Sequence, residues 1–231
     1  MSPIRCTLRF PLPRRPSSLL CLLLIAAAPL ARPDQGATLS ADTGWQSIDD
    51  KDGVALFSRA RPGSGMKEFK GTGVIDSSPA IVEKVLEDVA NYTNFMPYVT
   101  EARVISHDGI DEVTYQRLDV PFVSNRDYTV RVEHGTARGA SGVLIYRDTW
   151  QTANEAGPAE RHGVVRVKVN EGSWLLEPAG PAGASTQATY QIFTDSGGAL
   201  PAFLANHGCQ MAVPKLFEAI RKQVRDPKYK R

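Results

Sequence analysis

Residues 201–225, PAFLANHGCQMAVPKLFEAIRKQVR, carry the longest helical pattern in the chain. Apolar residues recur three or four positions apart along the second half of this stretch, at Val213, Leu216, Phe217, Ile220 and Val224. This spacing predicts a long C-terminal helix with one buried face. Pro214 lacks a backbone N–H and should bend the helix. A helix with a single apolar face needs another layer of structure to cover it.

The stretch before this helix is typical of antiparallel strands separated by turns. The strand candidates are residues 102–106, 112–120, 128–134, 143–151, 164–177 and 185–194. The clearest alternation places Val165, Val167 and Val169 on one side and polar residues on the other, as expected for a sheet with one covered face.

The N-terminal part of the predicted domain combines three strands with a shorter helix. Asp52-Gly53 is a turn signal between two extended segments, and a third strand follows near residues 69–76. Ser78-Pro79 then starts a helix that should end near Asn91. The order of strands, helix, antiparallel strands and long helix predicts an α+β fold, with helices on one face of a curved antiparallel sheet. A long helix across a strongly curved sheet leaves space beneath it, so we expect a cavity there.

The N-terminus has the pattern of an export signal. Arg5, Arg9, Arg14 and Arg15 precede a short apolar run at residues 19–28, and no acid occurs before Asp34. This pattern predicts a secretory signal peptide over residues 1–31, with an uncertain cleavage site, and a flexible leader over 32–44 before a domain at 45–231. The apolar run is shorter than the roughly 20 residues that span a membrane, and a retained N-terminal membrane anchor is the alternative.

Charge and cysteine content narrow the class of partner. Removing residues 1–31 takes away four arginines and no acids, which changes the formal net charge from +2 to −2. Nucleic-acid binding requires a concentrated basic face, so no nucleic-acid partner is expected. Cys209 is then the only cysteine, which rules out an intramolecular disulfide and favours a buried, unreactive thiol.

The sequence carries no recognisable catalytic or metal-binding motif. His107, His134, His162 and His207 are far apart and lack the spacing of metal ligands. No nucleophile, base and acid arrangement is evident. We therefore expect no catalytic residue, no metal and no cofactor.

Several short motifs occur in an order that resembles a known family. They are DDKDGV at 49–54, EFKG at 68–71, IDSSP at 75–79, DVANY at 88–92, FMPYV at 95–99, PFVSNRDY at 121–128, GSWLLEP at 172–178 and GGALP at 197–201. Over about residues 45–224 the chain resembles the START (StAR-related lipid-transfer) domains in their short bacterial form. The resemblance implies a helix-grip fold, in which a curved antiparallel sheet wraps around the C-terminal helix and encloses a tunnel for one lipid.

The family resemblance and the strand faces together suggest site residues. The predicted ligand-binding residues are Phe95, Tyr115, Arg117, Tyr146, Trp150, Val167, Trp174, Phe203, His207 and Met211. An aromatic face interrupted by a charge, as at Tyr146, Asp148 and Trp150, suits a cavity with a few polar anchors among apolar walls. Arg126-Asp127 occupies the place of an Arg–Asp pair in the family. It is expected to be either a polar fixture beside the ligand or, preferably, an ion pair that pins the strand end.

The leading functional hypothesis is an exported, non-enzymatic and monomeric lipid carrier, which as a bacterial family member would act in the periplasm and contact membranes transiently. Its ligand would be sterol-like, a phospholipid or an acyl lipid. One alternative is an enzyme similar to polyketide cyclases or aromatases that uses the same cavity with His or Arg as general acid. Another is a module that binds a protein through the groove.

Overall fold

The structure is a computed structural model that describes residues 44–139 and 142–230. The predicted signal peptide and almost all of the predicted leader lie outside the described residues. The strands are β1 (Gln46–Lys51), β2 (Val54–Ala60), β3 (Lys67–Ile75), β4 (Val99–Asp108), β5 (Asp111–Leu118), β6 (Asn125–Arg138), β7 (Leu144–Thr152), β8 (Val164–Arg166), β9 (Val169–Ala179) and β10 (Ser185–Asp195). The helices are α1 (Pro79–Glu87), α2 (Tyr92–Phe95) and α3 (Ala202–Gln223), with short 3₁₀ turns at Val89–Asn91, Asn154–Ala156, Pro181–Gly183 and Pro227–Lys230.

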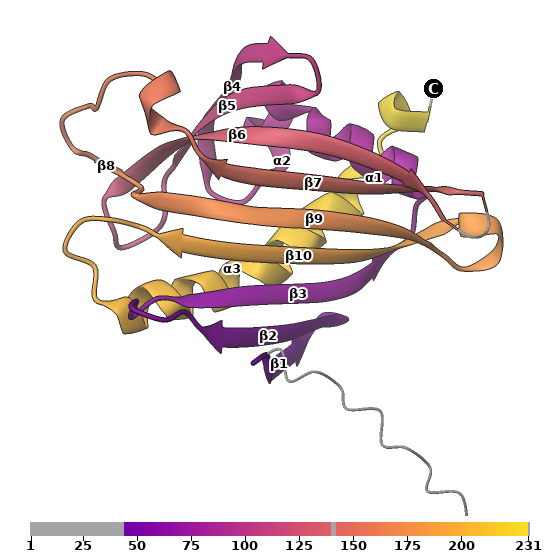
Figure 1. Cartoon of the computed structure of the whole chain (residues 1–231), viewed down its shortest axis with the longest axis horizontal. Helices are drawn as coiled ribbons and strands as arrows, with labels where there is room; N and C mark the ends of the chain where they lie inside the picture. The colour runs from indigo at the N-terminus through magenta and orange to yellow at the C-terminus, as the bar shows by residue number, and fades with distance from the viewer. Residues whose placement is uncertain (1–43, 140–141, 231) are drawn as a thin grey trace, which may run out of the picture. The chain divides into compact units, whose positions relative to one another are not determined.

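The described strands form one sheet in the order β1-β2-β3-β10-β9-β7-β6-β5-β4. Neighbours in this order are antiparallel, and β8 joins β6 as a short parallel strand. Pairing of β3 with β10 brings the N-terminal strands beside the last strand of the chain. Figure 1 shows α3 crossing behind the sheet, with α1 on the same side. The predicted α+β architecture, an antiparallel sheet covered by a long C-terminal helix, is confirmed.

Two predicted elements differ in detail from the structure. The strand expected over residues 164–177 is divided into β8 and β9, and the break falls at Val167 and Lys168. Beyond the break the predicted covered face does not hold, because Asn170 is buried on the inner face with Trp174 while Val169 is only half-buried. The helix expected to run to Asn91 ends at Glu87 and continues as a 3₁₀ turn. Ser78 adopts the extended conformation expected of a cap, but its backbone carbonyl, not its side chain, accepts the first helical hydrogen bonds.

The second half of α3 packs closely on β3 because β3 has glycine where the helix crosses. A Cβ atom added to Gly71 would lie 2.6 Å from Cγ1 of Val213, and one added to Gly73 would lie 3.3 Å from the Phe217 ring. Arg221 then fastens this half by donating hydrogen bonds to the backbone carbonyls of the β1–β2 turn and of β3. The C-terminal half of α3 is therefore firmly held, and the helix passes through Pro214 without ending.

The core lies between the sheet and these helices. Its buried apolar members are Val54, Leu56, Ile75, Val82, Val85, Leu86, Trp174, Leu176, Ala188, Val213, Phe217, Ile220, Val224 and Tyr229. Within the described part of the chain, no helix combines the length and apolar character needed to cross a membrane.

Candidate ligand-binding site

The sheet face that α3 covers carries an aromatic wall. Strand register places Trp150 of β7, Trp174 of β9 and Tyr190 of β10 on this face. The Trp174 ring lies 5.4 Å from Phe217 of α3 and 4.6 Å from Tyr190, and the Tyr190 ring is stacked 5.7 Å from Trp150. Gly172 leaves room for the indole of Trp150, since a Cβ atom there would lie 2.5 Å from that ring.

Polar groups hold two of the inward-facing aromatic side chains. Trp150 donates its indole N–H to Oδ1 of Asn170 at 2.9 Å. Tyr128 of β6 donates its hydroxyl to Oε1 of Gln116 at 3.0 Å. These bonds fix the orientation of both side chains, and apolar rings with a few polar partners are typical of small-molecule cavities.

Three residues on the inner face of the sheet and on the first half of α3 are only partly covered. Tyr128, Tyr190 and Cys209 are each half-buried and keep accessible surface. Burial nevertheless raises the pKa of all three, that of Cys209 to about 11. The first half of α3 therefore does not cover this part of the inner face completely.

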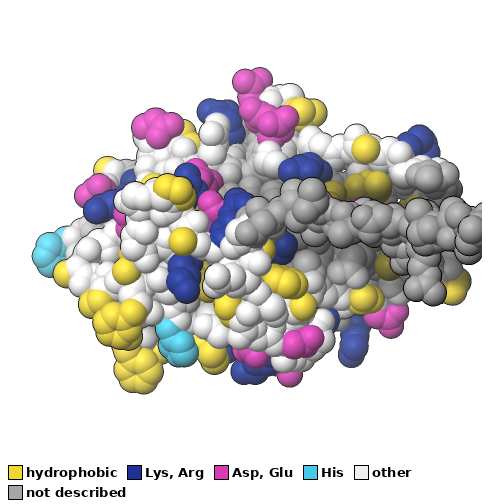
Figure 2. All heavy atoms as spheres, turned by 60° about the horizontal axis from the view of Figure 1, so that its bottom comes forward, with side chains coloured by type: hydrophobic (Ala, Val, Ile, Leu, Met, Phe, Trp, Pro, Cys, Tyr) yellow, Lys and Arg dark blue, Asp and Glu magenta, His cyan; other side chains and the backbone are white. Residues whose placement is uncertain are grey.

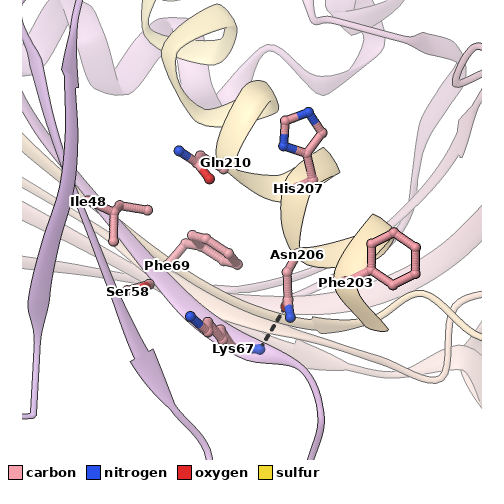
Figure 3. A pocket seen from close by; sticks show the side chains of 8 residues that line it. All are labelled: Ile48, Ser58, Lys67, Phe69, Phe203, Asn206, His207 and Gln210. Atoms are coloured by element: carbon pink, nitrogen blue, oxygen red, sulfur yellow. Dashed lines mark hydrogen bonds between the residues drawn. The ribbon is translucent and has the colours of Figure 1, made fainter. Parts of the chain in front are cut away.

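An open cavity of about 290 Å³ lies between the first strands and the first half of α3. Its lining residues are Ile48, Ser58, Lys67, Phe69, Phe203, Asn206, His207 and Gln210 (Figure 3). Asn206 bridges the cavity edge, because its Oδ1 accepts the backbone N–H of Lys67 at 2.9 Å and its Nδ2 donates to the carbonyl of Gly65 at 3.1 Å. The first half of α3 is thus tied to β3 mainly through one amide side chain, in contrast to its second half.

The structure places Phe203, His207 and Met211 on the exposed side of α3. Phe203 is 70% exposed and Met211 39% exposed, while His207 lines the open cavity. The reason is helical geometry. Each residue of a helix turns by about 100°, so Val213, ten residues after Phe203, points roughly 80° away from it. The Val213–Phe217 row packs on the sheet, and the Phe203–His207 row therefore does not. Phe203 and His207 lie at the mouth of the open cavity described above, and Met211 lies on the exposed side of the helix.

Tyr115 and Arg117 lie on the opposite face of the sheet from Trp150. Tyr115 is paired with Thr129 of β6, whereas Trp150 is paired with Val132, and positions of opposite parity on one strand point to opposite faces. The hydroxyl of Tyr115 donates to Oδ2 of Asp127 at 3.1 Å on this outer face. The sequence predicts that Tyr115 and Arg117 share one face of their strand, but it does not predict that this is the outer face of the sheet.

Arg126 and Asp127 anchor the start of β6, but each binds other residues and not its neighbour. Asp127 is 1% exposed and accepts a two-pronged contact from Arg166, at 2.7 Å and 3.3 Å. This hydrogen bonding raises the pKa of Arg166. Arg126 donates to the backbone carbonyls of Ser124 and Ser196. The geometry favours strand-end anchoring, with Arg166 in place of Arg126 as the ion-pair partner.

The remaining predicted site residues have three different surroundings. Tyr146 shares the inner face of β7 with Trp150 and is half-buried. Phe95 ends α2 and packs edge-on against Tyr92, with ring centroids 5.6 Å apart. Val167 is buried beside Asp127, whose carbonyl accepts its backbone N–H. Of the ten predicted residues, the structure brings Tyr146, Trp150 and Trp174 together on the face under α3.

Sequence reasoning missed Tyr128 and Tyr190 as wall residues. Both lie within predicted strands, and Tyr190 shares one apolar face of its strand with Ile192, two positions along. That alternation was the available signal, although it could not show which strands are neighbours.

Curated relatives match most of the described domain. An uncharacterised protein of Pseudomonas aeruginosa is 31% identical over 70% of this chain and 77% of its own length. The phosphatidylcholine transfer protein of Rattus norvegicus is 30% identical over 85% of this chain and 89% of its own length. The human phosphatidylcholine transfer protein is 28% identical over 81% of this chain and 86% of its own length.

Solved structures share the fold. A STAR-related lipid transfer protein of Xanthomonas axonopodis superposes with a TM-score of 0.70 at 25% identity, over 79% of this chain and 99% of that one. The human StAR-related lipid transfer protein 5 superposes with a TM-score of 0.67 at 19% identity, over 80% and 88% of the two chains. The helix-grip architecture expected from the family resemblance is therefore confirmed.

A family model described as polyketide cyclase / dehydrase and lipid transport matches residues 76–221, from the turn before α1 to the anchored half of α3. With the aromatic wall, the helix-grip fold and these relatives together, the chain belongs to this family and has a START-type lipid-transfer domain.

Proposed function

We propose that this protein is a non-enzymatic lipid carrier that holds one hydrophobic ligand between the sheet and the first half of α3. The observation that carries the proposal is the aromatic wall of Trp150, Trp174 and Tyr190 on the face under α3, in which Trp150 and Tyr190 keep accessible surface. Phosphatidylcholine is the first ligand to test, because relatives that match over most of the chain are phosphatidylcholine transfer proteins.

Burial of apolar surface supplies the binding energy in this proposal. An acyl chain that removes about 300 Å² from water gains about 7.5 kcal/mol at about 25 cal/mol per Å². Ordering of the ligand and loss of its free motion offset part of this gain. Polar groups beside the aromatic wall, such as Asn170 and Gln116, would orient the ligand and contribute little to affinity.

Transient membrane contact is part of the proposal. Exposed apolar side chains include Phe203 and Leu204 at the start of α3 and Phe122 in the loop between β5 and β6. Figure 2 shows hydrophobic side chains that project together from the surface. Phe122 is fully exposed and has a φ of 67°, a region that residues other than glycine rarely adopt and that often marks functional loops.

Ligand entry would use the weakly tied half of α3. Asn206 fastens the first half to β3, whereas Arg221 and the Val213–Phe217 row fasten the second half. Contact of Phe203 and Leu204 with a membrane would draw the first half outward and uncover the aromatic wall, so opening would limit the transfer rate.

The proposed location is the bacterial periplasm, with the protein acting as a monomer after removal of residues 1–31. The basic segment and short apolar run at the N-terminus support export. Retention of that run as a membrane anchor is the alternative, and it would confine transfer to the membrane that holds the protein.

A vesicle assay tests the carrier function. Donor vesicles contain self-quenched fluorescent phosphatidylcholine, and the protein should raise fluorescence by moving lipid to unlabelled acceptors. Trp174→Ala should reduce transfer by removing part of the wall, while Gln151→Ala, an exposed position next to Trp150 on β7, should leave transfer unchanged. Folding of both variants is checked by circular dichroism.

Two other outcomes would overturn the proposal. A protein that moves no lipid but converts a linear polyketide to a cyclic product would be an enzyme using the same cavity. A protein that recovers a stoichiometric protein partner and no lipid would be a binding module.

A further inference from the structure

Three side chains from three separate elements converge between α1 and the sheet. Glu83 comes from α1, His134 from β6 and Asp148 from β7, and one donor atom of each lies within 4.8 Å of the others. His134 and Asp148 are direct cross-strand partners on the inner face. Nδ1 of His134 lies 2.9 Å from Oδ1 of Asp148 and 3.8 Å from Oε1 of Glu83. A single imidazole nitrogen thus faces two carboxylates.

This cluster is buried and incompletely satisfied. The side chains of Glu83 and Asp148 are 6% and 5% exposed, and that of His134 is 24% exposed. Among the residues that the structure describes, Oε2 of Glu83 has no hydrogen-bond partner. Buried carboxylate oxygens are costly without a partner. One proton on Nδ1 can serve only one carboxylate at a time, so hydrogen bonding within the cluster leaves the other unsatisfied.

The electrostatic surroundings attract a cation. Burial and the neighbouring carboxylates Asp148 and Glu87 raise the pKa of Glu83. Hydrogen bonds that His134 donates to the carboxylates of Asp148 and Glu83 raise its pKa, so the cluster already attracts a proton. Glu112 adds further negative charge near His134. A divalent ion would displace the proton from Nδ1 and take its place between the carboxylates, so its binding would release a proton.

We propose that Glu83, His134 and Asp148 bind one divalent transition-metal ion of the zinc type. Ligand atoms about 2.0–2.2 Å from a shared ion at tetrahedral angles lie about 3.3 Å apart. The observed donor spacings of 2.9 Å and 3.8 Å bracket this value, so small side-chain shifts would suffice. One imidazole with two carboxylates suits Zn²⁺ better than Ca²⁺ or Mg²⁺, which prefer oxygen ligands throughout. Partial exposure of His134 leaves room for water as a fourth ligand.

The ion would act as a clip between layers. It would join α1 to two adjacent strands, β6 and β7, which the sequence separates by 51 and 65 positions from Glu83. Asp148 lies two residues from Trp150 on β7, so the clip would also steady the aromatic wall. The proposal does not depend on lipid transfer, and its test uses no lipid.

Calorimetric titration of the chelator-stripped full chain with ZnCl₂ tests the site. The expected result is one ion per chain and a higher midpoint of thermal unfolding, because an ion that binds the folded state alone stabilises it. Glu83→Gln keeps the side-chain volume and the His134–Asp148 pair, and it should weaken zinc binding at least about 100-fold, beyond the loss typical of outer-shell changes. Glu218→Gln, at an exposed position of α3 outside the cluster, is the control and should bind normally.

Cobalt substitution provides a readout of geometry. Co²⁺ bound at this site should give visible absorption bands typical of four-coordinate cobalt, and these should disappear in Glu83→Gln. If circular dichroism shows that this variant is unfolded, Asp148→Asn takes its place. The proposal fails if the wild-type chain binds no stoichiometric zinc. It also fails if the folded site variant binds zinc as tightly as Glu218→Gln.

Discussion

Replacement of Gly71 with alanine tests how closely α3 packs on β3. The new Cβ atom would lie 2.6 Å from Cγ1 of Val213, 3.3 Å from the Phe217 ring and 3.4 Å from Val54. The first distance is well inside van der Waals contact, and the neighbouring ring and valine leave little room to move. Overpacking of a well-packed core costs about 1–3 kcal/mol.

A double-mutant cycle separates this clash from a loss of backbone freedom. Val213→Ala removes the atom that the new methyl group meets, and alone it should cost about 1–2 kcal/mol through the lost burial. If the clash dominates, Gly71→Ala should cost at least about 1 kcal/mol less in the Val213→Ala background. Gly208→Ala is the control, because a Cβ atom there has open space in an exposed turn of α3. It should stabilise the protein by about 0.5–1 kcal/mol.

Urea unfolding followed by tryptophan fluorescence measures these free energies, and thermal unfolding provides a second measurement. For a domain of this size, a 2 kcal/mol loss lowers the unfolding midpoint by about 4–8 °C. The packing account would be refuted if Gly71→Ala matched Gly208→Ala, or if its cost were unchanged by Val213→Ala.

Three further predictions follow from buried polar contacts. Arg166→Ala should cost about 3–5 kcal/mol in urea unfolding because it leaves the carboxylate of Asp127 buried without its ion partner, and a loss under 1 kcal/mol would contradict this. Arg221→Ala should lower the free energy of unfolding by about 1–3 kcal/mol, because three backbone carbonyls lose their hydrogen-bond donor. Lys222→Ala, at the exposed neighbouring position, should change stability little. Equal effects of the two substitutions would mean that Arg221 does not anchor α3 to the sheet. Burial raises the pKa of Cys209 to about 11, so only about one part in a thousand of this thiol is thiolate at pH 8. Its alkylation at pH 8 should therefore be about 100-fold or more slower than that of an ordinary thiol, and it should accelerate roughly tenfold per pH unit up to pH 10. Fast alkylation at pH 8 would contradict the burial of Cys209.

The architecture could be predicted because its signals are local. The Val213–Phe217 row marks one face of a helix, and alternation marks each strand, so element types and order follow from the sequence. The break between β8 and β9 was missed because alternation continues across it. Element ends depend on which strands pair, and pairing is decided by contacts far along the chain.

The site was predicted less completely because it depends on those same distant contacts. Trp150 and Trp174 lie on the face under α3, and their contact with a ligand stays a prediction. Tyr115 has an equally apolar strand environment, yet it lies on the outer face, where its hydroxyl donates to Asp127 and its ring lies against Arg103. Asp127 and Arg166 form an ion pair across 39 positions of the sequence, and no local sequence pattern predicts this pair.

The Glu83 cluster shows the same limit for charged groups. The histidines were judged too far apart to share a metal, which considered spacing between histidines alone. His134 instead meets two carboxylates from other elements, and only the register of β6 with β7 and the position of α1 reveal this convergence.

Native mass spectrometry of the wild-type chain and of Cys209→Trp, after incubation with phosphatidylcholine vesicles, tests the proposed ligand space beneath α3 most directly. The indole would occupy part of that space, so the account predicts one bound lipid per wild-type chain and none on a variant that remains folded. A wild-type chain that stays free of lipid, together with a Cys209→Trp chain that cannot fold, would mean that the interior is already filled by protein side chains.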